Sequence, residues 1–312
     1  MTGGRWELLR ALGAMADSPA DARTASELLG LPGPDPAEHT EVFVLNCPPY
    51  AAIYLGPDGN LGGEAADRAA GFWRALGLTP PAEPDHLAAL LGLYAGLGEA
   101  AAGTHRTATR AALTRARTAL LAEHLWPWLP GYLDAITDLA TAALPAWAGL
   151  IGQAITAEVT AGGLGQPPGA RRLPLALRSA PPPPHPGSSL SDLLTALVAP
   201  ARSGMILTRA RLAQGAAHAC LGHRIGERRF TLRAMLEQDA PATLAWLSQE
   251  AERWSSRHAG RAAGDITNDW WSRRAARTAD LLREAAAALP TAAAAGQDRE
   301  RSSPVPTARG AR

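Results

Sequence analysis

The sequence predicts an all-α fold, and three observations support this. The apolar fraction is 46%, and much of it is Ala, which favours helices. The residues that favour strands (Val, Ile, Phe and Tyr) are sparse, and apolar side chains recur at helical spacing along most of the chain. We therefore expect the 312 residues to form a single helical domain. It should hold about ten helices in two groups, joined by a Pro-rich connector.

Helix signals follow one another through residues 1–160. Capping side chains, helix-start prolines and apolar spacing predict helices over 8–31 with a break at Ser18-Pro19, and over 36–47, 64–77, 87–97 and 106–125. The short apolar stretch 50–55 is expected to be extended or a loop. Residues 132–158 are predicted to be one long helix, kinked at Pro145.

The composition changes at residues 161–188, which contain Gly162-Gly163, Pro167-Pro168 and the run 181–184 of four prolines. Such a stretch is typical of a linker or long loop. Beyond it, helices are predicted to start near Ser189, Thr208, Phe230, Asp239 and Asp265. The sequence thus divides into an N-terminal helical part at 1–160, the connector at 161–188, a C-terminal helical part at 189–291 and a disordered tail at 292–312.

Charge and cysteine content exclude several classes of function. All 30 basic residues are Arg, so a Schiff-base lysine and a Walker-type phosphate loop are excluded. The formal net charge of +1 gives no electrostatic reason to expect nucleic-acid binding. Cys47 and Cys220 lie far apart in the sequence, so no disulfide framework is indicated and a reducing compartment is favoured. Residues 1–12 lack the apolar core of a signal peptide, so a cytoplasmic protein is expected. The uncharged stretch 139–157 contains Pro145 and small residues, and is expected to be a buried helix rather than a membrane span.

No metal or cofactor site is predicted. His218 and His223 are five residues apart, so on a helix they would not share a face as ligands, and Cys220 is expected to be a buried apolar residue. Three Arg-Arg pairs are expected to lie on solvated faces: 171–172, 228–229 and 273–274.

The tetrad Glu83-Pro84-Asp85-His86 is the candidate site. Pro84 is suited to a helix start, which would place Asp85 and His86 in the first turn of the helix over 87–97. The partial positive charge there favours an ionised Asp85 and a neutral His86. Three interpretations remain open: a plain helix start with capping acids, a carboxylate pair of Glu83 and Asp85 that binds a guanidinium group, and a general acid/base site.

Several segments together resemble one family, the TorD-type chaperones that mature enzymes of the dimethyl-sulfoxide-reductase group. The resemblance covers roughly residues 5–258, and the Glu-Pro-Asp-His tetrad after a Trp-bearing helix is its most specific part. The other segments that carry it are 49–56, 61–64, 72–78, 81–87 and 203–209.

The resemblance implies an all-helical cytoplasmic chaperone rather than an enzyme. Such proteins bind the twin-arginine signal peptide and the apo form of a molybdopterin-dependent oxidoreductase catalytic subunit, and delay export until the cofactor is inserted. Carried over to this chain, peptide recognition would fall to Asp85 and His86, with Glu83, Tyr50 and Trp73 as further candidates.

Two other classes of function stay open. The chain could be a helical structural or regulatory subunit of a redox enzyme complex, or a small-molecule enzyme that uses Asp85 and His86. For the chaperone, we expect no catalytic residues, no bound cofactor or metal, no stable membrane insertion, and a monomer or a domain-swapped dimer with the connector as hinge.

Overall fold

The computed structural model describes residues 3–139, 141–162, 172–185, 187–223, 226–261 and 265–289. The structure is 72% helical and contains no strand within these residues, which confirms the all-α prediction. The expected count of about ten helices is too low, since the described residues form sixteen α-helices and two π-helical segments. Some of them are only four or five residues long, too short to produce a periodic pattern in the sequence.

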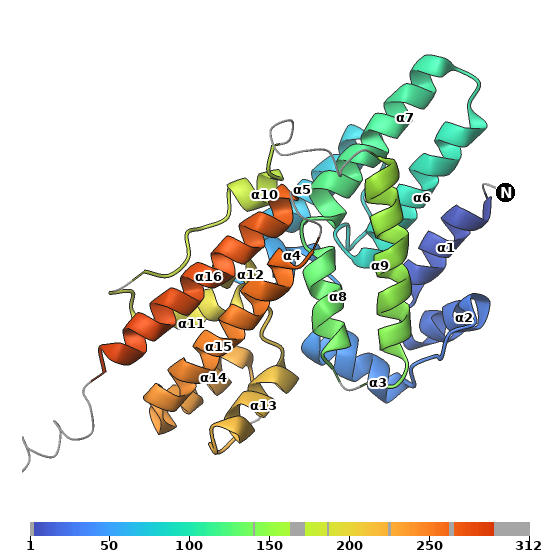
Figure 1. Ribbon diagram of the computed structural model, residues 1–312. Coiled ribbons are helices and arrows are strands. Elements are labelled where there is room, and N and C mark those ends of the chain that lie inside the picture. The colour runs from blue at the N-terminus through green and yellow to red at the C-terminus, as the bar shows by residue number, and fades with distance from the viewer. Residues whose placement is uncertain are drawn as a thin grey trace, which may run out of the picture.

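Most of the first nine helices form one side of the molecule in Figure 1, where α6 and α7 extend as a hairpin, while α4 and α5 lie toward the middle. Their bounds are α1 (Gly3–Ala14), α2 (Pro19–Leu29), α3 (Pro36–Thr40), α4 (Ala51–Leu55), α5 (Gly63–Ala75), α6 (Leu87–Gly103), α7 (Thr107–Leu120), α8 (Leu129–Thr137) and α9 (Leu144–Ala161). A π-helical segment follows α3 at Glu41–Asn46, and another follows α7 at Leu121–Leu125.

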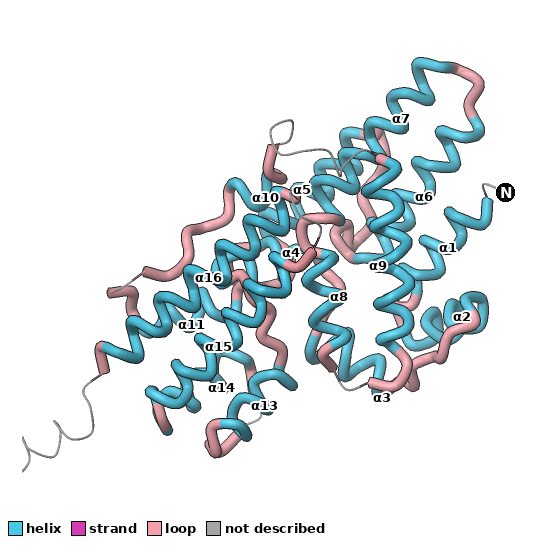
Figure 2. Tube along the Cα trace, in the orientation of Figure 1, coloured by secondary structure: helices cyan, strands magenta, loops and turns pink. Residues whose placement is uncertain are grey.

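The remaining helices lie on the other side, where the two longest, α15 and α16, run side by side (Figures 1 and 2). Their bounds are α10 (Leu175–Arg178), α11 (Leu190–Val198), α12 (Pro200–Ser203), α13 (Arg209–His218), α14 (Arg228–Gln238), α15 (Ala240–Ala259) and α16 (Ile266–Ala287). The short helix α10 lies inside the predicted connector. Residues 163–171 and 186 of that connector, and the predicted tail at 292–312, lie outside the described residues.

Side-chain caps explain why six of the helices begin where the sequence indicates. At six predicted starts an oxygen of the cap residue accepts a backbone N–H of the first turn, which satisfies a donor that the helix itself leaves unpaired. The capping residues are Ser18, Asp35, Ser189, Thr208, Asp239 and Asp265.

Two element predictions are wrong. Residues 51–55 form helix α4 rather than an extended segment or loop. The stretch predicted as one kinked helix over 132–158 is two helices, because α8 ends at Thr137 and Pro145 lies in the first turn of α9. Proline is tolerated in a first turn, where its missing N–H would have no helical partner.

One hydrophobic core includes residues from both groups of helices. Near its centre the ring of Tyr54 on α4 stacks on Trp128 with centroids 5.2 Å apart. Close packing of α1 on α6 depends on Gly98, since a Cβ there would lie 2.4 Å from the Trp6 ring. No helix among the described residues is both long and apolar enough to cross a membrane.

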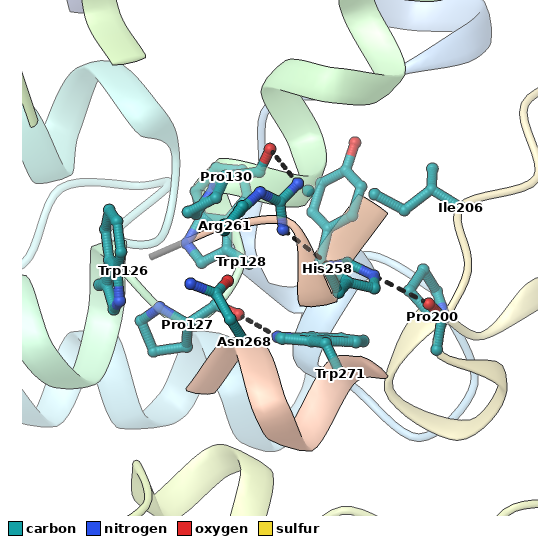
Figure 3. A pocket seen from close by; sticks show the side chains of 13 residues that line it. Trp126, Pro127, Trp128, Pro130, Pro200, Ile206, His258, Arg261, Asn268 and Trp271 are labelled. Atoms are coloured by element: carbon teal, nitrogen blue, oxygen red, sulfur yellow. Dashed lines mark hydrogen bonds between the residues drawn. The ribbon is translucent and has the colours of Figure 1, made fainter. Parts of the chain in front are cut away.

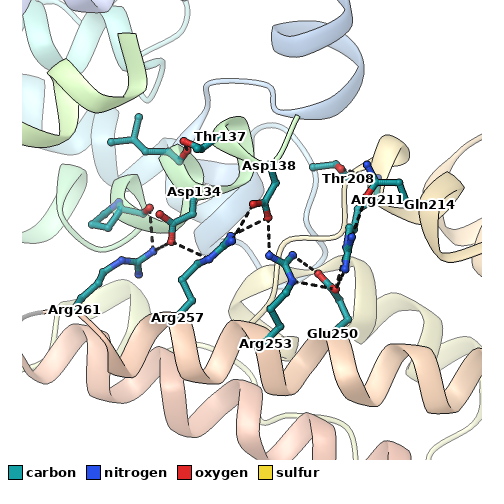
Figure 4. A network of polar contacts seen from close by, with 12 residues as sticks. Asp134, Thr137, Asp138, Thr208, Arg211, Gln214, Glu250, Arg253, Arg257 and Arg261 are labelled. Atoms are coloured by element: carbon teal, nitrogen blue, oxygen red, sulfur yellow. Dashed lines mark hydrogen bonds and ion pairs between the residues drawn. The ribbon is translucent and has the colours of Figure 1, made fainter. Parts of the chain in front are cut away.

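A row of ion pairs joins the two groups (Figure 4). Asp134 and Asp138 near the end of α8 face two arginines of α15 and Arg261 just after it, and Glu250 of α15 continues the row to Arg211 of α13. We call this row the ion-pair ladder; its members are Asp134, Asp138, Arg211, Glu250, Arg253, Arg257 and Arg261.

Candidate functional site

The tetrad lies against the segment that precedes α4. The backbone N–H of Ala51 donates to the carbonyl of Asp85 at 3.1 Å, and that of Leu87 donates to the carbonyl of Pro49 at 2.8 Å. Tyr50 and His86 therefore face each other in an antiparallel bridge. The pairing brings together two motifs that are more than thirty residues apart in the sequence.

Asp85 is a buried structural acceptor. Its side chain is 3% exposed, and its Oδ2 accepts the backbone N–H of Ala52 at 2.9 Å, in the first turn of α4. Burial raises the pKa of Asp85, although the N–H of Ala52 opposes the rise. Two expectations from the sequence are wrong here. Asp85 does not lie in the first turn of α6 but precedes that helix and caps α4. The helix dipole was expected to favour the ionised form of Asp85, but desolvation outweighs it.

His86 is the N-cap of α6 rather than a residue of its first turn. Its Nδ1 accepts the N–H of Ala88 at 3.2 Å, so the ring proton is on Nε2. The ring packs edge-on against Tyr50 with centroids 4.8 Å apart. Burial lowers the pKa of His86, in the direction expected from the sequence but through desolvation.

The other three candidate residues surround this loop. Glu83 is exposed, whereas Tyr50 is half-buried. Burial first, and then a hydrogen bond to Glu83, raise the pKa of Tyr50 to about 12. The indole N–H of Trp73 donates to the carbonyl of Pro84 at 3.4 Å. The structure thus gathers all five residues around one loop, with Asp85 and His86 inside it and Glu83 facing solvent.

One carboxylate of this site is not apparent from the sequence. Asp17 follows α1, is exposed, and lies close enough for its negative charge to raise the pKa values of Tyr50 and His86. No ion pair to Asp17, Glu83 or Asp85 occurs among the residues that the structure describes. We call these three residues the acidic locus. Only the packing of α1 on α6 brings Asp17 there, so no local pattern in the sequence could have identified it.

Two large grooves differ in their charge. The groove between α8 and α9 has a volume of about 1080 Å³, and the charged residues that line it, Asp134 and Arg261, pair with each other. The groove between α1 and α2, about 760 Å³, is lined by leucines and alanines together with Glu7, Asp21 and Arg10. Arg10 is paired with Glu99, so the α1–α2 groove combines an apolar floor with an excess of negative charge.

A small cavity lined by aromatic residues lies where the two helix groups meet (Figure 3). The Nε2 of His258 lies 3.1 Å from the carbonyl of Gly204, and Arg261 lies 2.7 Å from Nδ1. Because Arg261 can only donate, Nδ1 accepts and Nε2–H donates to Gly204. Burial first, then the charge of Arg261, lower the pKa of His258 to about 3, so this histidine is a neutral part of the core.

Other expectations from the sequence fail. Cys220 is exposed rather than buried, and its backbone adopts φ of 54° just after α13. Arg228 and Arg274, each from an Arg-Arg pair, are partly buried instead of lying on solvated faces. Of the third pair, residue 171 lies outside the described residues. No group of three His, Cys, Asp or Glu side chains in the described part of the chain could hold a metal ion.

Comparison with known families identifies the segment that holds the tetrad. Residues 36–134 match the family model described as nitrate reductase delta subunit, and this range contains all five predicted site residues. No curated protein sequence matches the chain. The family consists of molybdoenzyme maturation chaperones and includes the TorD-type proteins, which confirms the resemblance stated above. Residues 36–134 of the chain are therefore similar to the nitrate reductase delta subunit family.

Proposed function

We propose that this protein is a cytoplasmic chaperone that binds the twin-arginine signal peptide and the apo form of a molybdenum oxidoreductase catalytic subunit. It assists cofactor insertion and assembly before export. The observation that carries the proposal is the acidic locus, whose carboxylates have no basic partner among the described residues. A site left with net negative charge is complementary to a pair of arginines.

Within the acidic locus, the exposed carboxylates of Glu83 and Asp17 would bind the guanidinium groups. A carboxylate accepts two parallel N–H bonds from one guanidinium, an arrangement that lysine cannot reproduce. Asp85 and His86 would act indirectly, because they are buried and their hydrogen bonds hold the loop in position. Tyr50 and Trp73 are half-buried and offer aromatic surface beside Glu83.

The apolar run of the signal peptide would bind in the groove between α1 and α2. Leu28 on its wall is 77% exposed, which is unusual for a leucine and gives the groove apolar area to bury. The carboxylates of Glu7 and Asp21 on its lining suit a cationic peptide better than the neutral Asp134–Arg261 pair of the α8–α9 groove. Ordering a flexible peptide costs entropy, so moderate affinity is expected, which permits release.

Calorimetric titration with twin-arginine leader peptides tests the proposal. Binding should weaken about tenfold when the two arginines of the peptide become lysines, and also in the Glu83→Gln variant. Glu64→Gln is the matched control, since Glu64 is an exposed acid paired with Arg68 outside the acidic locus. Leu28→Asp should weaken binding more than Leu190→Asp, an exposed leucine elsewhere.

If no leader peptide binds, signal-peptide recognition is wrong. Stoichiometric co-purification with the mature enzyme would then favour the alternative role of a structural or regulatory subunit. Light scattering of the free protein would distinguish the monomer from the domain-swapped dimer.

A further inference from the structure

Three arginines come together where α12 rests on α16. Arg202 is on α12, and Arg274 and Arg277 are one turn apart on α16. Gly204, which ends α12 with φ of +78°, lies so close to α16 that a Cβ would be 2.3 Å from the backbone nitrogen of Ala275. This close approach places Arg202 beside Arg274.

Basic charge at this point is not neutralised by nearby acids. No ion pair to any of the three arginines occurs among the described residues. Burial first, and then the positive charges of Arg277 and Arg202, lower the pKa of Arg274 to about 10. The charges that shift the pKa of Arg274 are thus both positive. Like charges repel, and an anion bound between them would relieve this repulsion.

The guanidinium of Arg274 is held in place. It donates to the carbonyl of Pro181 in the segment after α10, and its Cζ lies 4.4 Å from the centre of the Trp270 ring. Stacking on an aromatic face and a hydrogen bond to the backbone fix the orientation of its remaining N–H donors. The site is thus partly preorganised, which lowers the entropic cost of binding a ligand.

A buried donor at the same place lacks an acceptor. The Nε of Arg202 is buried and has no hydrogen-bond partner in the part of the chain that the structure describes. Leaving a charged donor buried without an acceptor is costly, so such a group indicates that an acceptor is missing.

From this arrangement we infer that Arg202, Arg274 and Arg277 form a binding site for the phosphate group of a small molecule. A cluster of three neighbouring guanidinium groups, with Arg274 half-buried and Arg277 exposed, suits a compact dianion with several acceptor oxygens. An acidic peptide would instead require basic groups spaced along a surface. The site lies on α12 and α16, outside the matched residues 36–134 and apart from the acidic locus.

The test uses the full-length protein with inorganic phosphate and pyrophosphate as probes, at constant ionic strength maintained with chloride. Calorimetry and thermal unfolding should show saturable binding to the wild type. Arg202→Gln and Arg277→Gln should each weaken it about tenfold. Arg283→Gln, which removes an exposed arginine of α16 that pairs with Glu252 and Asp280, should leave binding unchanged.

Arg277 is exposed, so its variant keeps the site testable even if Arg202→Gln impairs folding. Absence of saturable binding of either probe to the wild type would overturn the inference. Equal binding to wild type and Arg277→Gln would also overturn it. Binding of an acidic peptide without binding of either probe would assign the arginines to a protein partner and contradict the phosphate site.

Discussion

The ion-pair ladder and the acidic locus use the same side-chain type in opposite ways. In the ladder, Asp138 accepts from Arg257 at 2.8 and 2.9 Å and from Arg253 at 2.8 Å, and every acid has an arginine partner (Figure 4). At the acidic locus, Asp85 accepts from a backbone N–H, and Glu83 and Asp17 face solvent without an ion-pair partner among the described residues.

The difference shows that the partners of a carboxylate decide its role. Carboxylates in the ladder stabilise the contact between α8 and α15, and little net charge remains there for a ligand. The exposed carboxylates of the acidic locus, Glu83 and Asp17, have no arginine partner among the described residues and are therefore available to a cationic peptide. The comparison can be tested by changing one carboxylate at a time.

The largest effect is expected from Glu250 of the ladder, whose side chain is 1% exposed. Burial opposes its ionisation, but hydrogen bonds from Arg253 and Arg211 outweigh burial and lower its pKa. Glu250→Ala would remove the carboxylate partner that Arg211 and Arg253 share, and should reduce the free energy of unfolding by roughly 3 kcal/mol. Urea denaturation measures this loss.

Glu252→Ala serves as the control for that experiment, because Glu252 is about half exposed and pairs with Arg283 at the surface. A surface pair contributes little, so the change should stay within about 0.5 kcal/mol. Similar losses in the two variants would show that burial of the ladder does not matter.

The next largest effect is expected from Asp85 at the acidic locus. Asp85→Ala removes the acceptor of the Ala52 N–H and should reduce the free energy of unfolding by about 2 kcal/mol. Glu83→Gln should change it by less than about 0.5 kcal/mol, since Glu83 is exposed. The same urea assay compares them, and a greater loss in Glu83→Gln would contradict the division between a buried acceptor and an exposed ligand-binding group.

Histidines extend the comparison to pH. His258, beside the ladder, has a pKa of about 3 in the folded protein, below the ordinary value of about 6.5 that applies to the unfolded chain. Between these values the unfolded chain binds the extra proton, so stability is fully present above pH 6.5 and falls as pH decreases. The slope from His258 is at most about 1.4 kcal/mol per pH unit.

Replacing His258 should therefore flatten the pH dependence of unfolding below pH 6.5. His258→Gln, measured by urea denaturation at several pH values, should show the smaller slope relative to wild type. His105→Gln, at an exposed position, should keep the wild-type slope. An unchanged slope in His258→Gln would mean that His258 is not held neutral by its surroundings.

Local signals in the sequence predicted much of the fold. Ser18, Asp35 and Asp239 cap helices as expected, since capping depends on residues within one turn. Helix α4 was missed because five apolar residues carry no periodicity, and its start depends on Asp85, more than thirty positions away.

The site was predicted in part. The sequence identified the tetrad and the aromatic residues around it, and the structure brings them together. It could not show that Asp85 is buried or that Asp17 lies nearby, since both depend on packing between α1, α4 and α6. In the same way, the burial of Arg274 follows from contacts with Trp270 and the segment after α10.

A double-mutant cycle between Glu83 and the leader peptide tests the central claim most directly. Wild type and Glu83→Gln are each titrated by calorimetry with the twin-arginine leader and with leaders in which one arginine is replaced by glutamine. If Glu83 binds one of these arginines, the two changes should be non-additive by about 1 kcal/mol for that arginine and close to additive for the other. Strict additivity for both arginines would contradict the account of the acidic locus as the guanidinium-binding site.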